Sequence, residues 1–306
     1  MWVEGRNHSW IGNVLWGGRA LPHIWLRTLS VTAFSMVATL LYQEVPAFHY
    51  SLTSMPFTVV GLALGIFLGF RNNAAYDRYW EGRRLWGSLV NTSRTLSRNL
   101  VTYLPPSVPR PTLVRLVYWQ VAFVHSLRLH LRNQSPVGSL EPFVPASALP
   151  DVVESRNVPN EILLRLSVEL QQLHVDGSLG EYRFVELTRQ LSTLSDIQGG
   201  CERIKNTPIP YSYTVIIHQV VALYVLSLPF GLVGSLHYLT PLVVLIIAYA
   251  FLGLDAVGDE IEDPFGEDLN DLPLSALSRT IEVNLREMLR DSAIPPMLQP
   301  HNGVLL

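Results

Sequence analysis

PFTVVGLALGIFLGFRNN, residues 56–73, is the most informative stretch of this chain. Its first fifteen residues, ending at Phe70, are almost entirely apolar or glycine, and Arg71 and two asparagines follow them directly. This pattern indicates a helix that reaches one face of a membrane and continues beyond it. The composition agrees, since only 15% of the 306 residues are charged and 48% are hydrophobic, which is unusual for a soluble protein.

Three further runs are long and apolar enough to cross about 30 Å of hydrocarbon as helices. They are residues 24–46, 210–234 and 238–254. Residues 112–131 are also rich in Leu and Val, but polar residues such as Arg115 and Arg128 interrupt them, so we expect a buried helix outside the membrane. No stretch alternates apolar and polar residues with period two, and the expected fold is an all-α membrane protein with four transmembrane helices.

The basic residues predict the orientation of these spans. The two short connections, Gln43–Met55 and Ser235–Thr240, contain no Lys or Arg, whereas fifteen Arg and the only Lys lie between the second and third spans. Because basic residues stay on the cytoplasmic side during insertion, both termini and the middle region should be cytoplasmic. We expect a multi-pass membrane protein in contact with the lipid bilayer.

The expected organisation alternates spans with cytoplasmic segments. Cytoplasmic helices are predicted at residues 112–131, 160–174 and 181–205, with a loop at 136–159. In order, we expect a cytoplasmic arm (1–23), spans at 24–46 and 56–70, a helical cytoplasmic region (71–209), spans at 210–234 and 238–254, and a cytoplasmic acidic segment with the tail (255–306).

Two regular stripes lie on neighbouring faces of the 56–70 helix. Residues four apart share a helix face, and stripes offset by one residue are about 100° apart. Small residues let another helix approach closely in lipid, while the second stripe presents bulky apolar groups. The stripes consist of Gly61, Gly65 and Gly69, and of Leu62, Ile66 and Phe70.

The bulky stripe has two interpretations. From the pattern alone, contact of Leu62, Ile66 and Phe70 with lipid or another span is the simpler one. Alternatively, several copies of the helix surround an axis and stack three apolar rings along about 12 Å, which would gate a pore by wetting and dewetting. One subunit cannot enclose such a path, so this alternative requires an oligomeric ring.

Carboxylates flank the spans at two places. The outer connections carry Glu44, and many acids follow Leu254. Rings of carboxylates at pore mouths attract cations, although a solvated tail is the simpler explanation of the acidic run. Its spacing matches no EF-hand loop, so we expect no resident metal or cofactor. The weak candidates for metal ligation are Glu267, Asp268 and Asp271.

Other motifs that carry chemistry are absent from the sequence. It contains no HExxH, GxSxG, P-loop or CxxC pattern, and we expect no enzyme. The net charge is −3 and the arginines are spread among apolar positions, which disfavours nucleic acid binding. His218 lies inside the third span, where an ionisable group is usually functional, but a neutral imidazole bonded to a neighbour explains it equally well.

Three blocks of sequence resemble the bacterial bestrophin homologues. The first is IFLGFRNN at residues 66–73, followed by Tyr79 and by LWG at 85–87. The others are GGCERIKNTPIP at 199–210 and EDPFGEDLNDLP at 262–273. Their order and spacing extend the resemblance over nearly the whole chain.

The resemblance implies a ring-shaped homopentamer with four spans per subunit and one axial pore. The hydrophobic neck of the family falls on Leu62, Ile66 and Phe70, which favours the pore interpretation of the stripe. A second, cytoplasmic constriction is expected near residues 179–183, with Tyr182 and Leu179 as candidates. The Ca²⁺-binding acidic run of eukaryotic members is interrupted here by Leu269 and Asn270, so the resemblance does not imply Ca²⁺ gating.

The leading hypothesis is a pentameric channel for monovalent cations with a hydrophobic gate, because bacterial members resemble cation channels and the outer loop is acidic. The alternatives are an anion channel, as in animal members of the family, and a membrane scaffold with a rarely open pore. The expected partners are further copies of the chain, lipid and the permeant ions.

Overall fold

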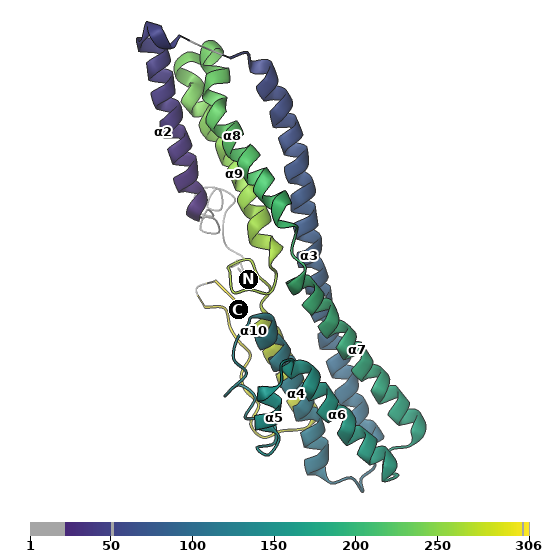
Figure 1. The fold of residues 1–306 in the computed structure, drawn as a ribbon. Coiled ribbons are helices and arrows are strands. Elements are labelled where there is room, and N and C mark those ends of the chain that lie inside the picture. The colour runs from purple at the N-terminus through teal and green to yellow at the C-terminus, as the bar shows by residue number, and fades with distance from the viewer. Residues whose placement is uncertain (1–21, 50–51, 302, 306) are drawn as a thin grey trace. The chain divides into compact units, whose positions relative to one another are not determined.

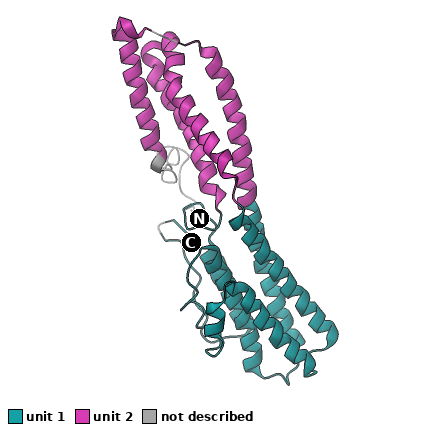
Figure 2. Cartoon of the chain, viewed as in Figure 1, with its two compact units in different colours: residues 1–3, 80–207, 264–306 teal, residues 4–79, 208–263 magenta. Residues whose placement is uncertain are grey.

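The computed structural model describes residues 22–49, 52–301 and 303–305. These residues form helices, and their only β contact is an isolated bridge between His301 and Val304. The expected amino-terminal arm, residues 1–23, lies outside the described residues except for the first two residues of a helix. Figure 2 shows two compact units, unit 1 (residues 1–3, 80–207 and 264–306) and unit 2 (residues 4–79 and 208–263).

Unit 2 contains the apolar helices. Its core joins α2, α8 and α9, and α3 adds Leu64 and Leu68 to it (Figure 1). The elements are α2 (Pro22–Glu44), the 3₁₀ helix η2 (Pro46–Phe48), the first part of α3 (Ser54–Tyr103), α8 (Tyr211–Leu236), the 3₁₀ helix η3 (His237–Leu239) and α9 (Thr240–Glu262).

Length and composition allow these helices to cross a membrane. Among the described residues, three stretches qualify: Ile24–Glu44, Ser54–Tyr103 and Tyr211–Glu262. The third contains both α8 and α9, separated only by η3. The α8 helix contains Pro229 and continues beyond it to Leu236.

The α9 helix continues past Leu254 to Glu262, where the sequence predicted the start of an acidic segment. Three acids of this extension, Asp255, Asp259 and Glu262, are bonded within unit 2. Arg71 donates to Asp255, and the amide of Ile209 donates to the Glu262 carboxylate at 3.0 Å. Hence Asp255 is a buried residue and not part of a solvated tail.

Unit 1 is built around α4. Most of this helix is buried, including the polar Gln120, which donates to the Ser93 carbonyl and accepts from the Ser97 hydroxyl, each at 2.7 Å. The prediction of a buried helix here is confirmed. The elements are the second part of α3, α4 (Arg110–Leu131), α5 (Leu149–Glu154), α6 (Val158–Val175), α7 (Glu181–Asn206) and α10 (Leu274–Met288).

Two further features of unit 1 are a short helix and a buried cysteine. The short helix α5 lies inside the stretch 136–159 that we expected to be a loop, and it buries only Val152. Cys201 on α7 is buried, and burial raises the pKa of its thiol to about 12. The thiol is therefore protonated at neutral pH and chemically inert.

Candidate functional site

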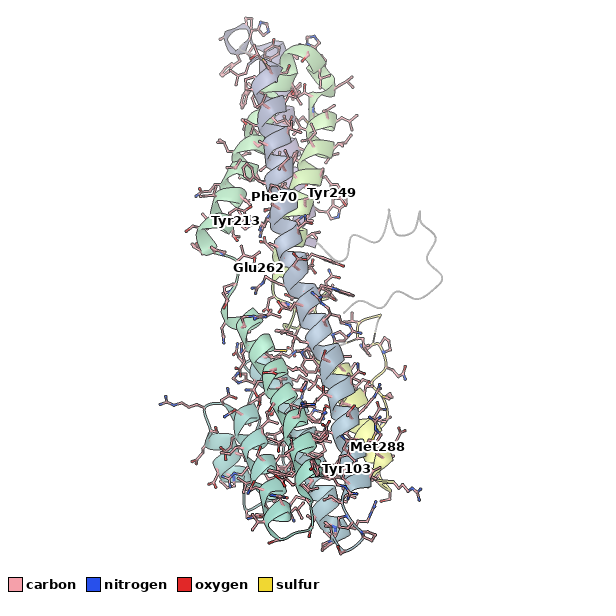
Figure 3. The ribbon with its side chains drawn as sticks, turned by 90° about the vertical axis from the view of Figure 1, so that its right-hand side faces the viewer. Phe70, Tyr103, Tyr213, Tyr249, Glu262 and Met288 are labelled. Carbon is pink, nitrogen blue, oxygen red and sulfur yellow. The ribbon has the colours of Figure 1, made fainter. Side chains whose placement is uncertain are left out.

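The candidate site is an exposed apolar face of α3 in unit 2. Leu62, Ile66 and Phe70 are 70%, 51% and 63% exposed, whereas Leu64 and Leu68 on the opposite face are buried in the core. Figure 3 shows Phe70 on α3, with Tyr213 on α8 and Glu262 at the end of α9. These three side chains are thus mostly uncovered by the described residues of the chain.

The glycine stripe divides into two parts. A Cβ atom on Gly61 would lie 2.5 Å from the Tyr224 hydroxyl, so this glycine permits close packing of α3 against α8 within the chain. At Gly65 and Gly69 an added Cβ would meet nothing within 4 Å. Among the described residues, nothing packs against these two positions, and they offer a smooth surface to another molecule.

The bulky face becomes polar directly beyond Phe70. Asn73 and Asp77 follow on the same side of α3, at three- and four-residue steps, and both are exposed. Asp77 therefore places a carboxylate on the same face two turns beyond the last bulky residue.

Arg71 anchors the end of the stripe to α9. Its side chain is fully buried, its Nη1 donates to Asp255 Oδ1 at 2.8 Å and to the Asp255 carbonyl at 3.2 Å, and its Nη2 donates to Asp259. Gly258 allows this approach, because a Cβ there would lie 2.4 Å from Asn72 Oδ1. A buried, paired cation fixes the rotation of α3 and so the direction in which Phe70 points.

The two candidates for a cytoplasmic constriction differ in the structure. Tyr182, near the start of α7, is 93% exposed, whereas Leu179, in the preceding loop, is 1% exposed. The Leu179 backbone is also held, since its amide donates to Leu173 and its carbonyl bonds to His174 Nδ1. Leu179 is thus a core residue and Tyr182 an exposed one, and the constriction stays a prediction for both.

Two of the three weak metal candidates, Glu267 and Asp271, have other partners. Glu267 accepts from Gln134 Nε2 at 2.8 Å and lies 3.5 Å from Arg132 Nη1. Asp271 is buried and accepts from the Asp268 amide at 2.7 Å, which closes a turn. Among the described residues, the group with clustered ligand atoms is a different one: His218, Asp255 and Asp259.

Sequence reasoning missed this cluster and its cation, Arg71. One signal was available, because Asp255 and Asp259 are four apart and so share a face of α9. Their partners on α3 and α8 are distant in sequence, and no local pattern links them.

Comparison with known proteins gives consistent matches along the chain. A sequence profile of the bacterial/fungal bestrophin proteins matches residues 1–287. The chain is 40% identical over 301 residues to the voltage-dependent anion channel-forming protein YneE of Escherichia coli O157:H7, which covers 98% of each chain. It is 38% identical over 284 residues to the voltage-dependent anion channel-forming protein RSc3414 of Ralstonia nicotianae, which covers 91% of each.

A solved structure has the same fold. The crystal structure of a bacterial bestrophin homolog from Klebsiella pneumoniae superposes with a TM-score of 0.85 at 40% sequence identity. The match covers 88% of this chain and 100% of that one. The helical architecture of both units therefore has a crystallographic counterpart.

Proposed function

This chain belongs to the bacterial/fungal bestrophin family, and from that premise we propose that it is one subunit of an ion channel with a hydrophobic neck. The observation that carries the proposal is the exposed stripe of Leu62, Ile66 and Phe70 on α3. Five copies of α3 around an axis would stack these side chains as three apolar rings along about 12 Å. Such a constriction gates by wetting and dewetting.

The proposed assembly is a homopentamer embedded in a bacterial inner membrane. Gly65 and Gly69 support it, since they lie open beside the bulky stripe and would let a neighbouring subunit approach α3 closely. The proposed spans are residues 24–46, 56–70, 210–234 and 238–254, with both termini, residues 71–209 and residues 255–306 in the cytoplasm. Residues 71–209 contain fifteen Arg and the only Lys of the chain, as expected of a cytoplasmic segment.

The permeant ion has two candidates. The names of the curated relatives describe anion channels, and this favours an anion-conducting pore over the cation channel that the sequence suggested. Cations remain the second candidate on a specific observation: Asp77 is exposed on the neck face of α3 just beyond Phe70. A carboxylate ring at that level would attract cations.

Reconstitution tests the function directly. Purified protein in planar bilayers under a salt gradient should give unitary currents, and the sign of the reversal potential decides between anions and cations. An absence of current in bilayers and of ion flux in liposomes would favour the membrane scaffold.

Tyr182 forms the proposed second constriction at the cytoplasmic exit. Its ring is almost fully exposed at the start of α7, as a side chain lining a wide cytoplasmic vestibule must be. Tyr182→Ala should increase conductance without changing assembly, and an unchanged conductance would remove Tyr182 from the pore.

A further inference from the structure

We propose that His218, Asp255 and Asp259 form a binding site for a divalent transition-metal ion of the Zn²⁺ class. His218 lies on α8 and the two acids lie one turn apart on α9, all within unit 2. One ligand atom from each residue lies within 4.8 Å of the other two.

The distances between ligand atoms match a tetrahedral metal centre. His218 Nε2 lies 3.4 Å from Asp255 Oδ1 and 3.2 Å from Asp259 Oδ2. Zinc binds imidazole nitrogen and carboxylate oxygen at about 2.0–2.1 Å, so two ligands on a tetrahedron are separated by about 3.3 Å. Both distances from His218 Nε2 match that value, and the ligand oxygens of Asp255 and Asp259 lie within 4.8 Å of each other.

The imidazole nitrogen lacks a hydrogen-bond partner. His218 Nε2 is buried and makes no hydrogen bond of acceptable geometry, although it faces two carboxylates. A buried polar atom without a partner is costly, and coordination of a metal by the neutral imidazole would remove that cost. Imidazole with carboxylate is also a common donor set for zinc.

The site is open on one side. The side chains of His218 and Asp259 are 39% and 41% exposed, so an ion can enter and a water molecule can supply a fourth ligand. Arg71 is a positioning residue, because it donates to both carboxylates and thereby orients them.

Arg71 also lowers the expected affinity of the site for a metal ion, because its positive charge lies beside the ligands. With a neutral His218, two carboxylates and one guanidinium sum to −1, and a divalent ion changes this sum to +1. The alternative is a metal-free ion-pair network of the same residues, which would give no tetrahedral Co²⁺ spectrum.

A consequence for gating rests on the proposed channel function. Arg71 directly follows the neck residue Phe70 and binds the same two acids. A metal that links α8 to α9 through these acids would stiffen the attachment of α3 at the end of the neck. Zn²⁺ should therefore change ion flux.

The test uses Co²⁺ as a spectroscopic probe for the full-length protein, stripped of metal with a chelator. Tetrahedral Co²⁺ has strong visible absorption bands that octahedral aqueous Co²⁺ lacks. We expect one such centre per subunit, and Zn²⁺ should bleach it. His218→Gln and Asp259→Asn should each weaken binding at least about 100-fold, because even loss of an outer-shell partner costs 10–100-fold.

His130→Gln is the matched control. His130 Nε2 lies 3.3 Å from a single carboxylate, Glu202, and lacks a third ligand, so this variant should bind Co²⁺ like the wild type. Melting temperatures establish that the variants are folded, and Asp259→Asn, which alters a half-exposed side chain, decides the question if His218→Gln does not fold.

Three results would overturn the metal site: no tetrahedral Co²⁺ spectrum in the wild type, an unchanged spectrum in both site variants, or equal loss in the control. The gating consequence is tested separately by ion flux with and without Zn²⁺. Binding without an effect on flux would leave the site in place and refute only its coupling to the neck.

Discussion

At the scale of single residues, Ile66 is the middle member of the exposed stripe on α3. We predict that Ile66→Ala raises single-channel conductance several-fold, because a smaller side chain widens and partly wets the narrowest zone. The sign of the reversal potential should not change, since an apolar ring carries no charge. Bilayer recordings of wild type and variant in matched gradients measure both quantities.

Ile246→Ala provides the control for this experiment. Ile246 is also an exposed isoleucine, but it lies on α9. Its truncation should leave conductance unaltered. If Ile66→Ala behaves in the same way, Ile66 does not line the constriction and the neck assignment is wrong. A reversal of sign would instead show that the neck contributes to selectivity.

Arg71 has a fully buried side chain that pairs with Asp255 and Asp259 in unit 2. Arg71→Ala removes the cation from the buried Asp255 and should lower the free energy of unfolding by about 3 kcal/mol or more. The measurement is SDS-induced unfolding of purified protein in mixed micelles.

Arg115→Ala is a suitable comparison for Arg71→Ala. The Arg115 side chain is partly exposed, and its partner Glu169 keeps a hydrogen bond from Trp119 Nε1 at 2.7 Å. Little stability should be lost. A similar loss for the two variants would show that the buried pair has no special role.

At the scale of elements, the contact between α3 and α9 depends on a glycine. A Cβ on Gly258 would lie 2.4 Å from Asn72 Oδ1 and 3.4 Å from Arg71 Nη1. Gly258→Ala should therefore displace the Asn72 side chain, which donates to the Leu254 carbonyl, and lower stability by about 1–3 kcal/mol. The same unfolding assay measures this effect.

Gly253 on the same helix is the internal control, because a Cβ there would meet nothing within 4 Å. Gly253→Ala should be neutral or stabilise α9 by up to about 1 kcal/mol through helix propensity. Equal effects at the two positions would contradict the proposed close approach.

The segment between α9 and α10 is expected to be insensitive to Ca²⁺. Glu267 is bonded to Gln134, and Asp271 closes its own turn, so few carboxylate oxygens remain for an ion that needs six to eight. Micromolar Ca²⁺ should leave channel currents unchanged. A steep activation that disappears in Asp268→Asn would contradict this prediction.

At the scale of the whole molecule, we predict a pentamer. The described residues leave most of the surface of Leu62, Ile66 and Phe70 uncovered. One copy of α3 cannot surround an axis, so the proposed pore exists only in an assembly. Native mass spectrometry of the protein in detergent should give five times the 34.4 kDa chain mass. A crosslinking ladder that ends at two, three or four subunits would reject this assembly.

Much of the architecture was predictable because it depends on local properties. The apolar runs that became α2, α8 and α9 are recognisable by length alone. The exposed stripe on α3 follows from four-residue spacing, since a straight helix converts spacing into a face. The helix α4 was identified as buried outside the membrane because polar residues interrupt its apolar stretch.

Contacts between residues that are far apart in the sequence were decided only by the tertiary structure. The extension of α9 depends on cations from α3, and a run of acids by itself indicates a solvated tail. Leu179 and Tyr182 are three residues apart, yet packing buries one and exposes the other. His218 meets Asp255 and Asp259 because hydrophobic burial brings α8 against α9, and the sequence of either helix contains no information about that distance.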